Sequence, residues 1–431
     1  METQAALFFK KTYIFTLLCF LCFVGNQQTI KASNIILNDT IGFNSYRGIV
    51  VEGNTKKPLE FASLNVNGTN ISTVSNSKGA FLLKVPKKYK NENVTISFLG
   101  YTSKVMNLSD FNEEETIIRL ETYIEELTEI SITVKDAPTL MREVLKRRTQ
   151  NYSSDNLVMT AFYREAIKKR KTYVSLSEAI ILLNKKPYAS ERSDILQLHK
   201  SRKSTDYKKL DTVALKHRGG AHSTVHLDIM KNPEMLLTQD TFKNYKFTFD
   251  TSTKIDDRVI YVVNFKPYRG AEDVFFYGKL YIDAQSLALV SAKFELDLSD
   301  ISKAKRFFII KKPQKADVTP VLAKYQVDYR KQGETWYHTY SRIELGFKIN
   351  WDKKLFNSTY YSTMELAITD WDKISDPKVV KSKDRLKPSV VMTDEASGFS
   401  DPEFWGEYNL IEPEKPIENA INKIKKQLKK I

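Results

Sequence analysis

Cysteine is almost absent from this sequence, with two in 431 residues. Both of them, Cys19 and Cys22, fall in the apolar run 12–25, which is typical of the core of a secretory signal peptide. Once residues 1–32 are removed as that signal, no cysteine remains, which excludes disulfide bonds, a thiol nucleophile and a thiolate metal site. We therefore expect the exported protein to be stabilised by burial of its hydrophobic residues.

Long hydrophobic runs are also lacking. The run 12–25 has about fourteen residues, whereas a helix needs roughly 20 to cross the hydrocarbon of a bilayer. Lys10 and Lys11 form the basic segment before it, and Gly25 or Ala32 is the small residue before the cleavage site. The sequence predicts an exported protein of the periplasm or outer membrane, with an uncleaved N-terminal anchor as the alternative.

Acidic residues are in the minority, with 52 Asp and Glu against 67 Lys and Arg and a net charge of +15. Residues 1–32 contribute +2 of this charge, which leaves +13 after export. Such an excess favours anionic partners. Export argues against nucleic acid, and the sequence has no arginine-rich arm or zinc-finger spacing. The predicted partner is an envelope protein, a glycan or a lipid, and not nucleic acid.

Motifs of several enzyme classes are missing. The sequence has no Gly-x-Ser-x-Gly and no glycine-rich phosphate loop. We assign no catalytic, cofactor or metal residues and predict that the protein is not an enzyme. A hydrolase that uses carboxylates from distant strands is the alternative.

Potential metal ligands concentrate in one segment, which contains His217, His222, His226 and Asp228. Imidazole suits zinc, and histidines four positions apart share a face on a helix or a strand. The glycine pair 219–220 nevertheless favours a loop, and the β-branched residues after His222 favour a strand nearby. We expect histidines on a surface loop, with a metal site as the alternative.

Short alternating strands fill residues 46–120. They are expected at 47–52, 61–66, 79–85, 94–98 and 116–120, with turn residues between them. This spacing predicts a small antiparallel β-sandwich without a helix.

The same module resembles the carboxypeptidase regulatory-like, prealbumin-type domain. The likeness lies in residues 47–50 (RGIV), 58–64 (PLEFASL), 73–85 (TVSNSKGAFLLKV) and 96–101 (ISFLGY). One departure is Asn76, where the family usually has Asp, so a turn-forming hydrogen bond is kept and a charge is lost. The resemblance implies no peptidase here, because none of the five histidines has Glu at the third following position.

A linker and a helix are predicted at 121–151. Residues 121–129 are acidic, and 130–134 are expected to form a short strand. Asp136 can cap a helix that has Pro138 in its first turn, and apolar residues recur at helical spacing over 140–145. We expect this helix to pack against the domain that follows.

Residues 152–372 are again rich in strands. Runs of β-branched and aromatic residues occur at 158–164, 173–183, 245–249, 259–265, 275–283, 288–295, 324–330, 335–346 and 359–369, with turns at 255–258 and 283–286. They predict a larger curved antiparallel sheet or partial barrel with a few helices. Something must fill its concave face.

Part of this domain, residues 261–295, resembles the meander of lipoprotein carriers, half-barrels that shelter acyl chains. Together with the first module and the DPEFW segment at 401–405, the chain resembles exported Bacteroidota proteins that join a regulatory-like domain to a carrier-like β domain. The resemblance implies an apolar ligand and no particular reaction.

Residues 373–431 are predicted to be a tail. Its aromatic residues Phe404, Trp405 and Tyr408 are expected to dock on the β domain. The segment 417–428 has a helical apolar stripe opposite several lysines, which favours packing on the β domain; contact with a membrane surface is the alternative.

The sequence therefore predicts a mainly β, non-enzymatic envelope protein whose β domain shelters an apolar ligand. The alternative is an accessory module of an outer-membrane system that binds glycan or protein through the sandwich.

Overall fold

The computed structural model describes most of the chain from residue 42 onward. The described residues are 42–112, 115–123, 136–205, 220–238, 242–268, 276–308, 316–352, 355–375, 380–392, 397–398, 404–414, 417 and 419. The predicted signal peptide, the strand at 130–134, His217 and nearly all of the C-terminal helix lie outside them. From Phe43 onward the described residues belong to one compact unit, and no helix among them is long and apolar enough to cross a membrane.

The first module consists of two sheets that share one hydrophobic core. One sheet has the strand order β4-β1-β7 and the other β3-β2-β5-β6. The strands are β1 (Phe43–Glu52), β2 (Ser63–Val66), β3 (Ser72–Val74), β4 (Ala80–Pro86), β5 (Asn93–Ser97), β6 (Lys104–Asn107) and β7 (Thr116–Leu120). The sandwich is antiparallel as predicted, except that β7 runs parallel to β1. A parallel pair needs a long crossover, which the strands between them supply.

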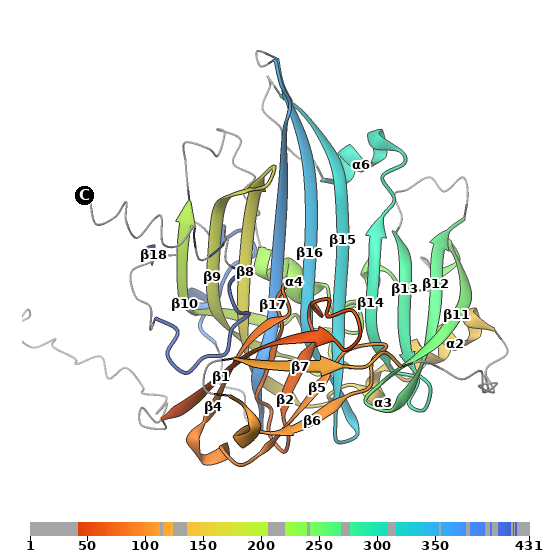
Figure 1. Cartoon of the computed structure of the whole chain (residues 1–431). Helices are drawn as coiled ribbons and strands as arrows, with labels where there is room; N and C mark the ends of the chain where they lie inside the picture. Colours follow the sequence, from red (N-terminus) through yellow and green to blue (C-terminus); the bar gives the residue numbers. More distant parts are fainter. Residues whose placement is uncertain are drawn as a thin grey trace, which may run out of the picture. The chain divides into compact units, whose positions relative to one another are not determined.

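The larger module is one open sheet of eleven strands in the described part of the chain (Figure 1). Its order is β11-β12-β13-β14-β15-β16-β17-β8-β9-β10-β18, and its described pairs are antiparallel except β10 with β18. The strands are β8 (Asn156–Lys169), β9 (Thr172–Lys185), β10 (Ile195–Thr205), β11 (Tyr245–Ile255), β12 (Arg258–Pro267), β13 (Phe276–Asp283), β14 (Leu289–Leu296), β15 (Ala316–Gln332), β16 (Thr335–Trp351), β17 (Ser358–Ile374) and β18 (Ser397–Gly398). The mainly β fold class is confirmed.

All nine strands predicted for this module are present, and so is the predicted hairpin turn between β11 and β12. Asp256 and Asp257 in that turn have φ values of 47° and 59°, the positive values that a two-residue type I′ turn requires. Strand β10 was not predicted from the sequence. Its sequence, ILQLHKSRKST, carries too many basic and polar side chains for a clear apolar alternation.

The large sheet has two faces that belong to different hydrophobic cores. On the inner face, side chains such as Tyr163, Ile181 and Leu366 join the largest core. On the outer face, neighbours of those residues, Phe162 and Ile180, join a second cluster. Successive side chains of a strand point to opposite faces, so β8 and β9 contribute to both cores.

Helices cover part of the inner face. α2 (Ala137–Lys146) begins at Asp136, whose side chain accepts a hydrogen bond from the Thr139 amide at 2.7 Å, as predicted. Its buried side packs near β11, and α3 (Arg148–Asn151) follows it. α6 (Ile301–Phe308), which escaped prediction, lies beside β15.

The segment predicted to be a histidine-containing loop is helical in its described part. α4 (Gly220–His226) lies against β16 and β17, behind the sheet in the view of Figure 1. Ala221 and Val225 are one turn apart and both buried in the inner core. Packing of this stripe on the sheet outweighs the low helix propensity of Gly, Thr and Val, and the expectation of a loop is wrong there.

The outer face is covered by the sandwich and by residues 404–411. The Ser72 hydroxyl donates a hydrogen bond to the Ile368 carbonyl at 3.2 Å, which joins β3 to β17. Trp405 is buried, and its ring packs edge-on against Phe162 with 5.8 Å between the ring centroids. This face is therefore closed by parts of the chain that are distant in sequence.

Asn76, the residue that departs from the family pattern, links the sandwich to the tail. Its Oδ1 accepts hydrogen bonds from the Lys78 amide at 2.9 Å and the Ala80 amide at 3.0 Å, as the turn requires. Its Nδ2 donates to the Glu412 carbonyl at 2.8 Å. An ionised Asp at this position has no hydrogen to donate, so the amide gives a contact that the family residue would lack.

Candidate ligand-binding cleft

A cleft of about 1460 Å³ lies on the inner face beside α4 and is open to solvent. Its floor is apolar and comes from the middle of three adjacent strands, with Tyr325 on β15, Ile343 and Leu345 on β16, and Met364 on β17. Its walls are α4, the loop 189–196 before and into β10, and residues between 380 and 388. The volume exceeds the roughly 300–1,000 Å³ of most small-molecule pockets.

Charged side chains surround the opening of the cleft, and the basic ones are more numerous. Lys186, Arg192 and Lys387 lie on its lining together with Arg148, Lys231 and Arg385. The acidic side chains of the lining are Glu191, Asp194 and Glu234. An apolar floor below a predominantly cationic rim suits a ligand with an apolar body and a negative end.

Glycine at the start of α4 allows the helix to approach the sheet. A Cβ on Gly220 would lie 2.3 Å from the Tyr163 hydroxyl and 2.9 Å from Glu165 Oε2. A larger residue would therefore require the Tyr163 hydroxyl, the Glu165 carboxylate or the helix itself to shift.

A buried acid lies under this glycine. Glu165 accepts a hydrogen bond from the Tyr163 hydroxyl at 2.9 Å and is 2% exposed. Burial raises the pKa of Glu165 to about 7, although the Tyr163 hydrogen bond acts in the opposite direction.

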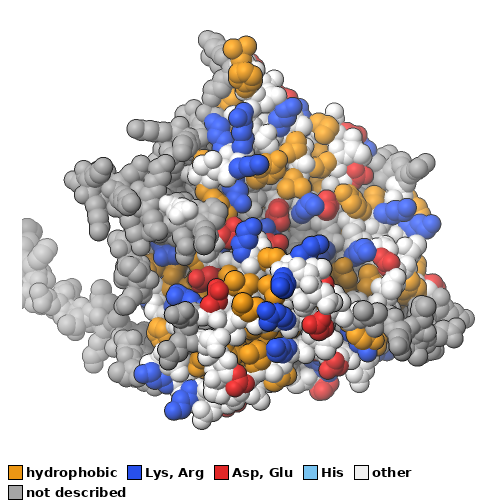
Figure 2. Space-filling model, viewed as in Figure 1, with side chains coloured by type: hydrophobic (Ala, Val, Ile, Leu, Met, Phe, Trp, Pro, Cys, Tyr) orange, Lys and Arg blue, Asp and Glu red, His pale blue; other side chains and the backbone are white. Residues whose placement is uncertain are grey.

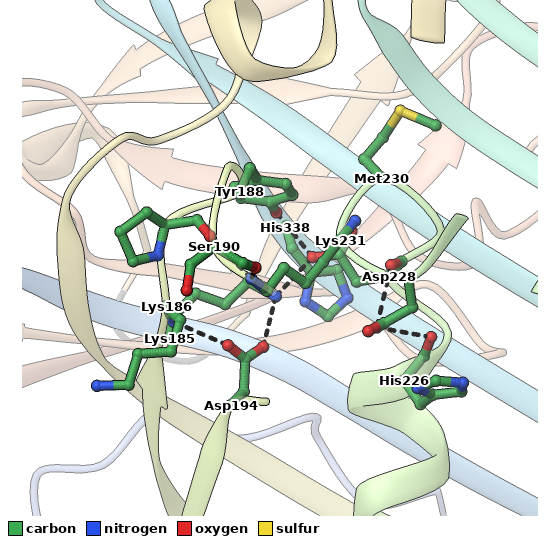
Figure 3. Close-up of polar contacts among 12 residues, drawn as sticks. Lys185, Lys186, Tyr188, Ser190, Asp194, His226, Asp228, Met230, Lys231 and His338 are labelled. Atoms are coloured by element: carbon green, nitrogen blue, oxygen red, sulfur yellow. Dashed lines mark hydrogen bonds and ion pairs between the residues drawn. The ribbon is translucent and has the colours of Figure 1, made fainter. Parts of the chain in front are cut away.

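A network of buried ionic and hydroxyl groups fixes the segment that follows α4 (Figure 3). At its centre, Asp228 lies 2.6 Å from the Lys185 ammonium of β9. The hydroxyls of Tyr188 and Tyr329 donate to the same carboxylate at 2.7 and 2.8 Å. Lys185 also contacts Asp194, at 2.9 Å. These bonds join α4's end, two strands of the sheet and the loop before β10.

The same network supports the wall of the cleft. Asp194, which lines the cleft, accepts hydrogen bonds from both the Lys185 ammonium and the Lys186 amide, the latter at 2.8 Å. Lys231, also on the lining, donates to the carbonyls of Pro187, at 2.8 Å, and Ser190. The charged groups at this wall are thus bonded to the protein, and they hold the loop in place.

The charges of the network are strongly favoured in the fold. Burial alone would raise the pKa of Asp228, but the Lys185 ammonium outweighs this effect and holds that pKa at about 2. Burial would likewise lower the pKa of Lys185, but Asp194 and Asp228 raise it. Nearby, burial lowers the pKa of His338 to about 4, and its Nε2 lies 2.7 Å from the Ser341 hydroxyl. His338 is therefore neutral at pH 7.

The histidines and Asp228 that the sequence singled out do not converge. His222 Nε2 lies 2.7 Å from the Leu386 carbonyl, whereas His226 is exposed and lies 3.7 Å from Glu234. Asp228 is fully buried in the network instead. Across the ranges that the structure describes, no group of three His, Cys, Asp or Glu side chains is arranged to hold a metal.

Sequence reasoning missed the partners of Asp228. Lys185 ends an apolar run, AIILLNK, and a strand of that kind gives no sign that its last lysine is buried. The floor residues of the cleft were recognised only as strand residues, because a cleft depends on what the rest of the chain leaves uncovered.

A second ionic cluster is enclosed on the outer face. Glu178 lies between the guanidinium groups of Arg164 and Arg202, at 2.7 Å from each. Arg164 also donates to the Ile411 carbonyl at 2.7 Å, and Arg202 lies over the Trp405 ring at 4.8 Å. This cluster therefore ties the sheet to the tail.

A family model for the CarboxypepD_reg-like domain matches residues 46–132. This confirms the resemblance of the first module, and the rest of the chain lies outside the match. No curated protein matches the chain.

Solved structures give only distant likenesses. A DUF1329 family protein from Desulfovibrio piger is 11% identical, covering 57% of this chain and 96% of its own, with a TM-score of 0.25. A LolA superfamily protein from Nitrosomonas europaea is 10% identical, and the match covers 57% of this chain and 96% of that protein, with a TM-score of 0.23. Lipovitellin is 9% identical, and the match covers 55% of this chain and 27% of lipovitellin, with a TM-score of 0.28. Such low scores establish neither a shared fold nor a shared function, so the functional interpretation rests on the cleft.

Proposed function

We propose that this protein is an envelope binding protein that holds an amphiphile in the inner-face cleft. The apolar part of the ligand lies on the floor formed by Tyr325, Ile343, Leu345 and Met364, and an anionic headgroup meets the basic rim. The observation that carries the proposal is the combination of this apolar floor and a mainly cationic rim in one open cleft.

The energetics favour a ligand with a long apolar part. Burial of apolar surface contributes about 25 cal/mol per Å², and the floor side chains extend across three strands. Lys186, Arg192 and Lys387 would set the orientation of the ligand through its negative end.

The proposed role is binding and not catalysis. Two ionisable side chains of the lining, Asp194 and Lys231, are bonded to the loop around residue 190 and support it. His222 is likewise bonded to the Leu386 carbonyl. The predicted signal peptide and the positive charge support a role in the envelope, where anionic amphiphiles are abundant.

The test is to purify residues 33–431, extract the bound lipids and examine the protein by native mass spectrometry. We expect an amphiphile to co-purify with the protein. The extracted amphiphile should displace a fluorescent fatty acid from the protein when it is added back. Leu345→Trp and Ile343→Trp fill the floor and should lower affinity for the fluorescent fatty acid by roughly tenfold or more.

Val321→Trp is the matched control, because Val321 lies on β15, outside the cleft, and is 43% exposed. It should leave the affinity unchanged. Fatty-acid binding that all three variants retain, or a purified protein that binds no amphiphile, would show that the cleft is not the site.

A further inference from the structure

Exposed apolar side chains gather at one end of the large sheet. We call it the hairpin end; it contains the β8–β9 turn, the β16–β17 hairpin and α6. Five of the ten large hydrophobic side chains that are exposed among the described residues lie there. They are Ile301, Val321, Leu355, Phe356 and Tyr361.

The tip of the β16–β17 hairpin is the extreme case. Leu355 is 97% exposed and Phe356 is 77% exposed, whereas the next most exposed large hydrophobic side chain described, Val105 of the sandwich, is at 57%. Single exposed apolar residues are ordinary. Two adjacent ones at the tip of a projecting hairpin indicate a surface that is covered in use. Figure 1 shows this hairpin extending beyond the neighbouring strands.

Cations lie directly behind the tip. The β8–β9 turn consists of basic residues, Lys168 to Lys171, and the Arg170 amide donates to the Thr359 carbonyl at 2.8 Å, which fixes the turn beside β17. Lys348 is exposed on β16 at the level of Thr359. Since a strand rises about 3.3 Å per residue, Arg170 and Lys348 lie roughly 13 Å behind Leu355, and Lys168, which is paired with Tyr361, lies roughly 20 Å behind it. Figure 2 shows Lys and Arg side chains below the apolar atoms at this end.

The carboxylates at this end are fewer than the cations. Asp297 and Asp300 precede α6, and Asp300 is paired with Lys303 at 3.9 Å. Asp317, at the start of β15, is paired with Lys305 of α6 at 2.9 Å. Asp352 adjoins the tip itself, where Lys353 and Lys354 follow it in the sequence. The hairpin end therefore combines an apolar tip with a net positive surround.

We propose that the hairpin end docks on an anionic lipid bilayer. Leu355 and Phe356 enter the boundary between headgroups and acyl chains, which lies roughly 5–10 Å deep for interfacial segments, and the cations behind them meet the phosphates. A stable protein partner needs an interface of about 1,000 Å² or more, which two side chains at a narrow tip do not offer. This inference does not depend on the cleft.

The test is flotation of residues 33–431 with vesicles of phosphatidylcholine alone or with roughly one third phosphatidylglycerol. This chain retains the compact unit that begins at Phe43 and lacks the apolar segment 12–25. We expect binding to the anionic vesicles that weakens as salt is added. Leu355→Ser with Phe356→Ser should weaken it by roughly tenfold to a hundredfold. Arg170→Gln should weaken it by roughly fivefold.

Val105→Ser with Ile117→Ser is the matched control, because both side chains are exposed apolar residues of the sandwich. It should bind like the unchanged protein, and thermal unfolding verifies that each variant is folded. Equal binding by the tip variant, equal loss in the control, or no vesicle binding at all would overturn the proposal. The proposal would also be overturned if the unchanged protein is a dimer and the tip variant is a monomer, because the tip would then contact a second copy of the chain. Floor variants such as Leu345→Trp should still float, which separates this result from the fate of the cleft.

Discussion

The two faces of the eleven-stranded sheet each bury an ionic triad, and the two triads have opposite composition. The outer triad has two cations around one anion, Arg164–Glu178–Arg202, under the sandwich and the tail. The inner triad has two anions around one cation, Asp194–Lys185–Asp228, beside an open cleft. Both connect segments that are distant in sequence.

The difference lies in what each triad holds. The outer triad belongs to a closed interface, because Arg164 and Arg202 continue into contacts with Ile411 and Trp405 of the tail. The inner triad holds a loop and the end of α4 at the margin of the cleft. The same type of interaction therefore closes one face and borders an open cleft on the other.

The largest effect is expected on the outer face, from Glu178→Ala. The substitution leaves two buried guanidinium groups without their carboxylate, and arginine cannot relieve this by losing its proton. We expect a loss of about 4 kcal/mol in the free energy of unfolding, measured by urea denaturation of residues 33–431. The control is Asp155→Ala, which removes a solvent-exposed pair with Lys373 and should leave the free energy of unfolding nearly unchanged. Equal losses would mean that the outer triad does not hold this face closed.

On the inner face, Lys185→Met should cost slightly less, about 3 kcal/mol at pH 8. Asp228 would keep the hydroxyls of Tyr188 and Tyr329 and, unlike an arginine, it can neutralise itself by taking up a proton. Its low folded pKa makes the wild-type contribution present above the ordinary Asp value and lost as pH falls toward about 2. At pH 4 this contribution is still almost complete, but without Lys185 burial raises the pKa of Asp228 in the variant, so Asp228 takes up a proton there and the deficit should be smaller at pH 4 than at pH 8. Urea denaturation at the two pH values measures this difference, and a deficit independent of pH would argue against the ion pair as its cause.

The sequence predicts the strands of both faces better than it predicts what covers them. Apolar alternation identified β8 and β9 because it depends on local period. Glu178 and Lys185 lie on opposite faces of β9. The alternation could not show that Glu178 has buried partners on β8 and β10, or that Lys185 has a buried partner in the segment after α4. α4 itself was misjudged because its helical state depends on packing against β16 and β17, which local propensity does not include.

On the inner face, Glu165→Gln should stabilise the protein. The folded pKa of Glu165 is raised from 4.5 to about 7, so the wild type loses stability as pH rises between these values and remains less stable above them. Glutamine keeps an acceptor for the Tyr163 hydroxyl and carries no charge to bury. At about 1.4 kcal/mol per pKa unit, the gain should be roughly 3 kcal/mol at pH 8 and close to zero at pH 4. Thermal unfolding at the two pH values measures it, and a destabilised variant at pH 8 would mean that the charge of Glu165 has a favourable partner.

The smallest effect on stability is expected from filling the cleft itself. Leu345 is 8% exposed and borders the cleft, so the added ring of Leu345→Trp can extend into the cleft and should cost only about 1 kcal/mol in the free energy of unfolding. Ala367→Trp adds volume to the closed outer face, where Ala367 is 2% exposed, and should cost about 2 kcal/mol or more through overpacking. Urea denaturation of the two variants compares the faces directly. Equal costs would mean that the inner face is as tightly packed as the outer one, because a closed core penalises an added ring on either side of the sheet.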